Sequence, residues 1–269
     1  MTADAKVVMH LSPSIAATLL QRSAARAWRE HSKGGGEQRD ATEPMRRGKL
    51  LDRLLFQTGA EIVIVDAPDW RTKVAQSARE EAENRGAIAV LAGKHEEALA
   101  TANEIRAALF DRGIDLAKGR AQHRVVWDSA GVACKGFLDV LFIDDGEATI
   151  YDLKITDDAS PGAIKLDFRS SLQHAAYIEA IETLHPELAG RVTMRFVYAE
   201  PDGDLTIAEP DGPLRSLGSS RWRRAVALWG ECLAMGTFPG YPRDVYRIEG
   251  KPWELDAELP KGGSQNVGF

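Results

Sequence analysis

One segment in the middle of this 269-residue chain restricts its fold more than any other. Two apolar runs, Val132 to Ile143 and Glu147 to Ile155, stand on either side of Asp144-Asp145-Gly146. An Asp-Gly pair between apolar runs is a strong signal for a hairpin with a two-residue turn. We therefore expect two antiparallel strands in which Asp144 lies opposite Glu147.

This register brings three charged side chains together. Counting back from the turn places Asp139 opposite Asp152, and directly opposed side chains have Cβ atoms about 5 Å apart. Lys154 lies two residues beyond Asp152 and therefore points to the same face of the sheet. The apolar residues expected on this face are Phe137, Leu141, Ile143, Ala148 and Ile150.

The expected surroundings of these charges favour metal binding. Both runs are apolar on both faces, which is typical of covered central strands. Two carboxylates in such a place repel each other and resist desolvation, and a divalent cation relieves both problems. Hard oxygen ligands favour Mg²⁺, for which Mn²⁺ can substitute. The alternative is a buried salt-bridged triad of Asp139, Asp152 and Lys154, which is costly to desolvate.

The rest of the chain predicts a mixed α/β architecture. The order is helices, three strands, a helix, a strand pair and a long helix, which favours a mixed sheet with helices packed on it. The expected helices cover residues 12–29, 44–56, 71–85, 95–110, 169–184 and 214–235. The expected strands cover residues 61–65, 124–127, 132–143, 147–155, 192–199 and 205–208, and residues 33–42 read as a polar loop.

Composition excludes several classes of protein. No apolar run approaches the roughly 18 residues of a membrane span, and Met1 to His10 lacks the features of a signal peptide, so we expect a cytoplasmic protein with no membrane contact. Cys134 and Cys232 cannot form a disulfide framework or a four-cysteine metal site. The net charge of −6 argues against coating nucleic acid by bulk charge but permits a local basic path.

Two short motifs resemble those of a nuclease superfamily. Asp139 followed after a gap by Asp152-Leu153-Lys154 resembles the PD-(D/E)XK signature. Gln173 and Tyr177 lie four residues apart, on one face of the expected helix, and resemble the Gln-x-x-x-Tyr motif of RecB-like nucleases. For this pair, an ordinary amphipathic helix is the alternative explanation.

An ordered set of motifs from Leu11 to Ala180 resembles the nuclease region of RecE (exonuclease VIII) and its prophage relatives. The family usually carries His where this chain has Asp52, and Glu where this chain has Gln122. Asp52 can still bind Mg²⁺, although it can equally be a solvated residue paired with a neighbouring cation. The matching segments are Leu11-Ser12-Pro13-Ser14, Arg47-Gly48-Lys49-Leu50-Leu51-Asp52, Asp69-Trp70-Arg71-Thr72-Lys73, the strand ending in Trp127, and Cys134-Lys135-Gly136-Phe137-Leu138-Asp139.

This resemblance implies a restriction-endonuclease-like core, with a central mixed β-sheet flanked by helices and a helical N-terminal extension. Residues 1–118 would form the helical part that contributes one metal-ligand helix. Residues 119–240 would form the nuclease core and residues 241–269 a tail, together making one compact domain.

The resemblance also implies a reaction. The chain would be a Mg²⁺-dependent exodeoxyribonuclease that acts on duplex DNA ends in phage-type recombination or repair, together with a single-strand annealing protein and as a ring-like homo-oligomer. Asp52, Asp139, Asp152 and the Leu153 carbonyl would bind the metal, and Lys154 would position the attacking water. The alternatives are a nicking or restriction endonuclease, and an inactive DNA-binding module in which Gln122 stands in place of the family's glutamate.

The remaining candidates are supporting or DNA-contacting residues. Gln173 and Tyr177 would support Lys154 or a DNA phosphate. The cluster Arg221-Trp222-Arg223-Arg224 can grip phosphates, but the solvated face of a helix explains it as well. The residues expected to touch the DNA backbone are Lys165, Arg169, Arg46 and Arg47.

Overall fold

The computed structural model describes residues 8–34, 42–245, 247–251 and 253. Three predicted regions therefore lie wholly or partly outside the described residues: the start of the chain, the polar loop at residues 33–42 and the tail after residue 240.

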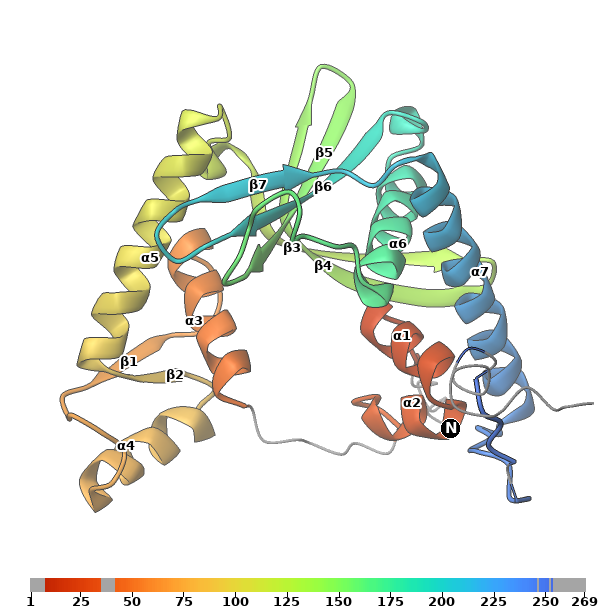
Figure 1. Cartoon of the computed structure of the whole chain (residues 1–269), viewed down its shortest axis with the longest axis horizontal. Coiled ribbons are helices and arrows are strands. Elements are labelled where there is room, and N and C mark those ends of the chain that lie inside the picture. Colours follow the sequence, from red (N-terminus) through yellow and green to blue (C-terminus); the bar gives the residue numbers. More distant parts are fainter. Residues whose placement is uncertain (1–7, 35–41, 246, 252, 254–269) are drawn as a thin grey trace, which may run out of the picture.

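A five-stranded mixed sheet forms the centre of the molecule, as predicted (Figure 1). Its order is β3-β4-β5-β6-β7; β5 and β6 run parallel and the other neighbours run antiparallel. A parallel pair needs a crossover connection, and helix α6 (Phe168–Leu184) provides it. The strands are β3 (Arg120–Ser129), β4 (Val132–Asp144), β5 (Glu147–Ile155), β6 (Val192–Ala199) and β7 (Leu205–Ala208).

The turn between β4 and β5 fixes the register that the sequence predicts. Asp145 and Gly146 have φ values of 45° and 76°, the left-handed conformation that a two-residue hairpin turn of type I′ requires. Asp144 pairs with Glu147, and the ladder continues to Val140 opposite Tyr151. The paired ladder ends there, one position before Asp139 and Asp152.

Helices cover both faces of the sheet, so β4 and β5 are central strands (Figure 1). On one face lie α6, α7 (Gly212–Met235), α1 (Pro13–Gln21) and α2 (Ala24–Glu30), with a core that includes Trp127, Ile150 and Trp229. On the other face lie α3 (Glu43–Phe56) and α5 (Ala92–Asp111).

The alternation of side chains along β4 breaks at Asp139. Leu138 belongs to the core under α6, whereas Val140, two residues further on, belongs to the core under α3 and α5. Phe137 therefore does not share a face with Leu141, contrary to the simple alternation expected from the sequence. The irregularity coincides with Gln122 on β3, which has a φ of 46°.

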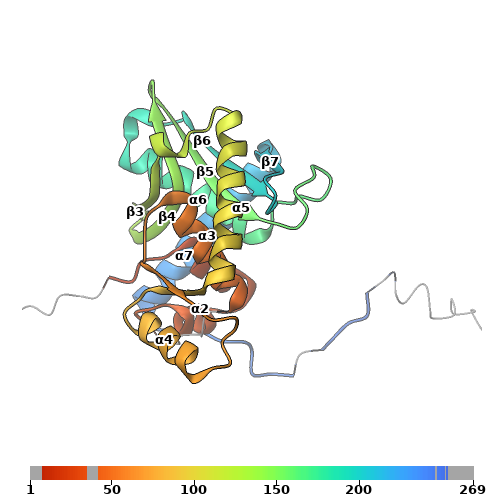
Figure 2. The same ribbon diagram turned by 90° about the vertical axis from the view of Figure 1, so that its left-hand side faces the viewer.

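A small unit lies beyond α3 and α5, away from the main sheet (Figure 2). Strands β1 (Ile62–Val65) and β2 (Ile88–Leu91) pair in parallel and are connected through α4 (Lys73–Asn84). Strand β2 is missing from the sequence prediction because a four-residue apolar run does not distinguish a strand from the start of the next helix. Short 3-10 helices cover Leu116–Lys118 and Pro186–Leu188.

Other sequence predictions are also settled by the described residues. The single helix expected over residues 12–29 is two helices, because the Ser23 hydroxyl accepts a hydrogen bond from the Arg26 backbone N–H and begins α2. Cys134 and Cys232 are buried free thiols. Within the described part of the chain, no helix is long and apolar enough to cross a membrane.

Glu179 joins three elements of the core, which gives a stability prediction. Its carboxylate accepts hydrogen bonds from the indole N–H groups of buried Trp127 (3.0 Å) and buried Trp222 (3.2 Å). Glu179→Ala should leave both donors unsatisfied and lower Tm by about 5–10 °C, corresponding to roughly 2–4 kcal/mol. Thermal unfolding checks this, with the exposed Glu96→Ala as control; an equal Tm for the two variants would contradict it.

Candidate active site

The carboxylate of Asp139 lies where the β4–β5 ladder stops. Its Oδ2 accepts a hydrogen bond of 2.9 Å from the backbone N–H of Leu153 on β5. A side-chain oxygen thus satisfies a backbone donor that a regular ladder would pair with a carbonyl. The contact fixes Asp139 beside the Asp152-Leu153-Lys154 segment.

Asp152 is buried, with 2% of its surface exposed, and is surrounded by donors. Gln173 donates a hydrogen bond from Nε2 to Asp152 Oδ1. The Nζ of Lys154 lies 2.5 Å from Oδ2, but the direction of this contact is not that of a hydrogen bond, so Oδ2 has a cation beside it and no aligned donor.

Helix α6 presents Gln173 and Tyr177 to the two strands, as their four-residue spacing predicts. Besides its bond to Asp152, Gln173 accepts a hydrogen bond of 3.3 Å at Oε1 from Lys154 Nζ. The Tyr177 hydroxyl accepts a hydrogen bond of 3.4 Å from the backbone N–H of Phe137. A Cβ atom on Gly136 would collide with the Tyr177 ring, so glycine is needed there for helix and strand to meet.

Gln122 points at the same site from β3. Its Nε2 lies 3.5 Å from Asp139 Oδ1, so the side chain acts as a donor to the carboxylate. A glutamate in this position would place another negative charge beside Asp139. The amide therefore lowers the charge repulsion at the site rather than adding a further anionic ligand.

Burial and mutual repulsion raise the pKa values of the acidic groups. Burial, followed by the charge of Asp152, raises the pKa of Asp139 to about 8. Burial also raises the pKa of Asp152, against the lowering effect of Lys154. The pKa of Asp52 on α3 is raised to about 6, again by burial first and by the Asp152 charge second. Carboxylates perturbed together in this way are typical of functional sites.

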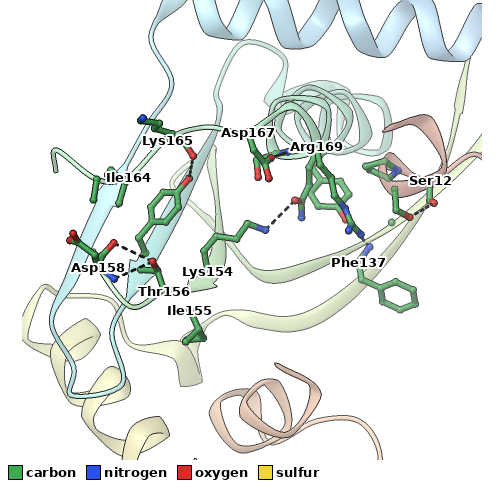
Figure 3. A pocket seen from close by; sticks show the side chains of 18 of the residues that line it. Ser12, Phe137, Lys154, Ile155, Thr156, Asp158, Ile164, Lys165, Asp167 and Arg169 are labelled. Carbon is green, nitrogen blue, oxygen red and sulfur yellow. Dashed lines mark hydrogen bonds between the residues drawn. The ribbon is translucent and has the colours of Figure 1, made fainter. Parts of the chain in front are cut away.

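Two cavities share Lys154, Ile155 and Thr156 in their linings, and Figure 3 shows the first of them. The first, of about 910 Å³, is lined by Gln173 and Tyr177 together with the predicted DNA contacts Lys165 and Arg169. The second, of about 1140 Å³, is lined by Asp52 and the predicted contacts Arg46 and Arg47. The structure thus brings these residues to two adjoining cavities that share Lys154, together called the cleft below.

The cleft also contains charged and aromatic residues that the sequence did not identify as site residues. Phe137, Lys135, Trp70, Arg79 and Lys94 line one cavity or the other. Trp70, Lys135 and Phe137 lie in segments that resemble the RecE-like family, which was the available signal, whereas only the tertiary arrangement brings Arg79 and Lys94 to the cleft. By contrast, Arg221 bonds to the Ser171 hydroxyl and stacks over Phe168, so its cation already has partners on α6.

The donor set fits a hard divalent cation. Asp139 and Asp152 offer carboxylate oxygens that burial makes costly to ionise, and Oδ2 of Asp152 is a buried oxygen without an aligned donor. Among the described residues, no three His, Cys, Asp or Glu side chains are grouped closely enough to hold an ion. Asp52 therefore does not extend the pair of carboxylates into a complete cluster in this conformation.

Comparison with known proteins gives a family and a fold. The family model of the PD-(D/E)XK nuclease superfamily matches residues 10–243. The crystal structure of a candidate exonuclease from Eubacterium rectale superposes with a TM-score of 0.56 at 13% identity, covering 93% of each chain. The structure of SSO0001 is 14% identical over 67% of this chain and 85% of its own, with a TM-score of 0.29 that is too low to support a common fold. No curated protein sequence matches the chain.

The raised pKa of Asp139 predicts how metal-free stability depends on pH. The folded protein keeps this proton up to about pH 8, whereas the unfolded chain loses it near pH 4, so stability should fall as the pH rises between those values. In EDTA, Tm should drop by at least about 3 °C from pH 5.5 to 8.5, and Asp139→Asn should reduce that drop. Thermal unfolding measures both. The exposed Asp144→Asn should keep the wild-type slope, and equal slopes for all three proteins would contradict the prediction.

Proposed function

Because the chain belongs to the PD-(D/E)XK nuclease superfamily, we propose that it is a metal-dependent deoxyribonuclease that removes nucleotides from the ends of duplex DNA. The observation that carries the proposal is the cluster of Asp139, Asp152 and Lys154, in which Gln173 bonds to Asp152 and Lys154, and Lys154 lines both cavities. The fold shared with a candidate exonuclease supports the proposal.

In this proposal Asp139, Asp152 and the Leu153 carbonyl hold the cation. The N-terminal part, residues 1–118, adds Asp52 on α3 as a further ligand. Oxygen ligands favour Mg²⁺, with Mn²⁺ as a substitute. When bound, such an ion neutralises charge that develops on the phosphate during hydrolysis. Its binding also offsets the repulsion between the two buried carboxylates.

Lys154 positions the attacking water and stabilises the negative charge of the transition state. Asp152 Oδ2 and Gln173 Oε1 hold its ammonium group from two sides, which fixes its direction before substrate arrives. A donor fixed in advance does not have to reorganise during the reaction and is therefore effective. Tyr177 supports this arrangement by holding the β4 backbone at Phe137.

The basic residues of both cavities supply the contacts to DNA. Lys165 and Arg169 line the first cavity, and Arg46 and Arg47 line the second. Phosphate contacts of this kind set the register of the strand without reading its sequence. The resemblance to RecE-like nucleases extends the proposal to phage-type recombination or repair, with a single-strand annealing partner and a ring-like homo-oligomer.

One observation supports a second function. Gln122 places an amide on Asp139 where a glutamate would be expected from the resemblance, and this favours an inactive DNA-binding module if that residue is essential. The intact Asp139, Asp152 and Lys154 set favours the nuclease.

The reaction is tested by incubating the protein with linear and closed circular duplex DNA in Mg²⁺, Mn²⁺ or EDTA. We expect metal-dependent release of nucleotides from linear DNA only. Lys154→Ala should abolish turnover and leave DNA affinity within about threefold of wild type, because its charge acts mainly in the transition state. Asp152→Asn should also abolish turnover, whereas the exposed Lys118→Ala should not.

Two outcomes would redirect this proposal. Rapid cutting of closed circles would favour an endonuclease. No cleavage of any DNA with either metal, in a protein that still binds DNA, would favour the binding module. It would identify the exchange of glutamate for Gln122 as the cause of the lost activity.

Asp52 gives a separate prediction. Asp52→Asn should lower activity, or raise the Mg²⁺ concentration needed for half-maximal activity, by more than about tenfold, as the loss of a ligand commonly does. A Mg²⁺ titration of the rate measures this, with the exposed Asp66→Asn as control. Unchanged activity and metal dependence would make Asp52 a structural residue of α3.

A further inference from the structure

An exposed phenylalanine stands at the edge of the proposed active site. Phe137 lies on β4 two residues before Asp139, and 52% of its surface is exposed. Leu138, Val140 and Leu141, which follow it on the same strand, are all at most 1% exposed. Single exposed apolar side chains are common on protein surfaces, so what distinguishes Phe137 is its place in the lining of the cleft, on a strand whose next residues are buried.

The position of this ring is fixed by its neighbours. Gly136 and Leu138 face α6, where Tyr177 packs against the glycine. Successive side chains of a strand point to opposite faces, so Phe137 points away from α6. Figure 3 shows its ring extending from the strand on that side. The Tyr177 hydroxyl holds the backbone N–H of Phe137, so the ring stands on a restrained section of backbone.

Two cations accompany the ring. Arg124 pairs directly with Phe137 across β3 and β4 and is exposed. Lys135 lies two residues earlier on β4, on the same face, and lines the same cavity. An aromatic face beside basic side chains is the composition of surfaces that bind single-stranded nucleic acid, in which bases stack and phosphates pair with cations.

We propose that Phe137 stacks on a base of the strand that is cut, so that this strand enters the site unpaired across the β3–β4 surface. Two residues of a strand span about 6.6 Å, which places the ring within reach of a nucleotide next to the one at Asp139. A base inside a duplex is covered on both faces, so any base behind the terminal pair can offer its face to the ring only after it is unstacked from a neighbour. The inference rests on the proposed function and specifies its substrate as a DNA end with unpaired terminal nucleotides.

The test measures binding without turnover. The full-length protein is titrated, in Ca²⁺ and again in EDTA, against a short single strand that carries 2-aminopurine and against a duplex of the same sequence closed by loops at both ends. The wild type should quench the fluorescence of the single strand. Phe137→Ala should abolish the quenching and raise the Kd of the single strand about tenfold, since a base–aromatic stack contributes ~1–3 kcal/mol.

The controls separate stacking from general damage. Phe137→Trp should retain both quenching and affinity. Phe110→Ala, which removes a phenylalanine of similar exposure (64%) on α5, should behave as wild type. Phe137→Leu keeps the apolar surface without an aromatic face, so it should lose the quenching. It replaces the alanine variant in the test if that variant fails to fold. The Kd of the closed duplex should change less than that of the single strand in every Phe137 variant.

The results also distinguish this inference from the proposed function. No quenching by the wild type, or unchanged single-strand affinity in Phe137→Ala, overturns the role of Phe137 even if the protein is an active nuclease. An equal loss of affinity for single strand and closed duplex also overturns it. A chain that cleaves no DNA, yet quenches through Phe137, contradicts the nuclease and leaves the single-strand site in place.

Discussion

The repulsion between Asp139 and Asp152 inside a covered sheet is the constraint on which the rest of the site depends. Two ionised carboxylates at this depth are costly, and each contact around them reduces that cost. Asp139 accepts from the Leu153 backbone and from Gln122. Asp152 accepts from Gln173 and lies against Lys154. The site is therefore a set of donors arranged around a charge pair that the fold by itself would not favour.

Local rules predict the pair, and tertiary structure determines its details. The left-handed turn at Asp145-Gly146 fixes the register, and a period of two along β5 then places Asp152 and Lys154 on one face. The end of the ladder before Asp139 and the left-handed backbone of Gln122 have no local signal, because they depend on how three strands diverge. The break before α2 was detectable in principle, since serine is a strong helix N-cap.

The position of Asp52 shows the limit of reasoning from sequence most clearly. The residue lies far from β5 in the chain, and no periodicity links the two. On α3, buried Leu51 and Leu55 belong to the core that α3 and α5 form with the sheet, and this packing orients the helix. Asp52 follows Leu51 directly, so the apolar face that anchors α3 also directs the carboxylate towards the cleft. Only the resemblance of the ordered motifs to those of a nuclease family placed it near the Asp139 and Asp152 carboxylates beforehand.

Gln173 occupies a position that requires a neutral side chain with both a donor and an acceptor. Its amide donates to Asp152 and accepts from Lys154, so one side chain needs both a donor and an acceptor. A glutamate would add charge to an already repelling pair, and a lysine would leave the Lys154 ammonium without an acceptor. Asp152 and Gln173 lie against two sides of that ammonium, which has three N–H groups. The contact with Asp152 is an ion pair and the bond to Gln173 uses one N–H, so Lys154 can still donate to a phosphate or an attacking water, and Gln173 on α6 helps to set the direction.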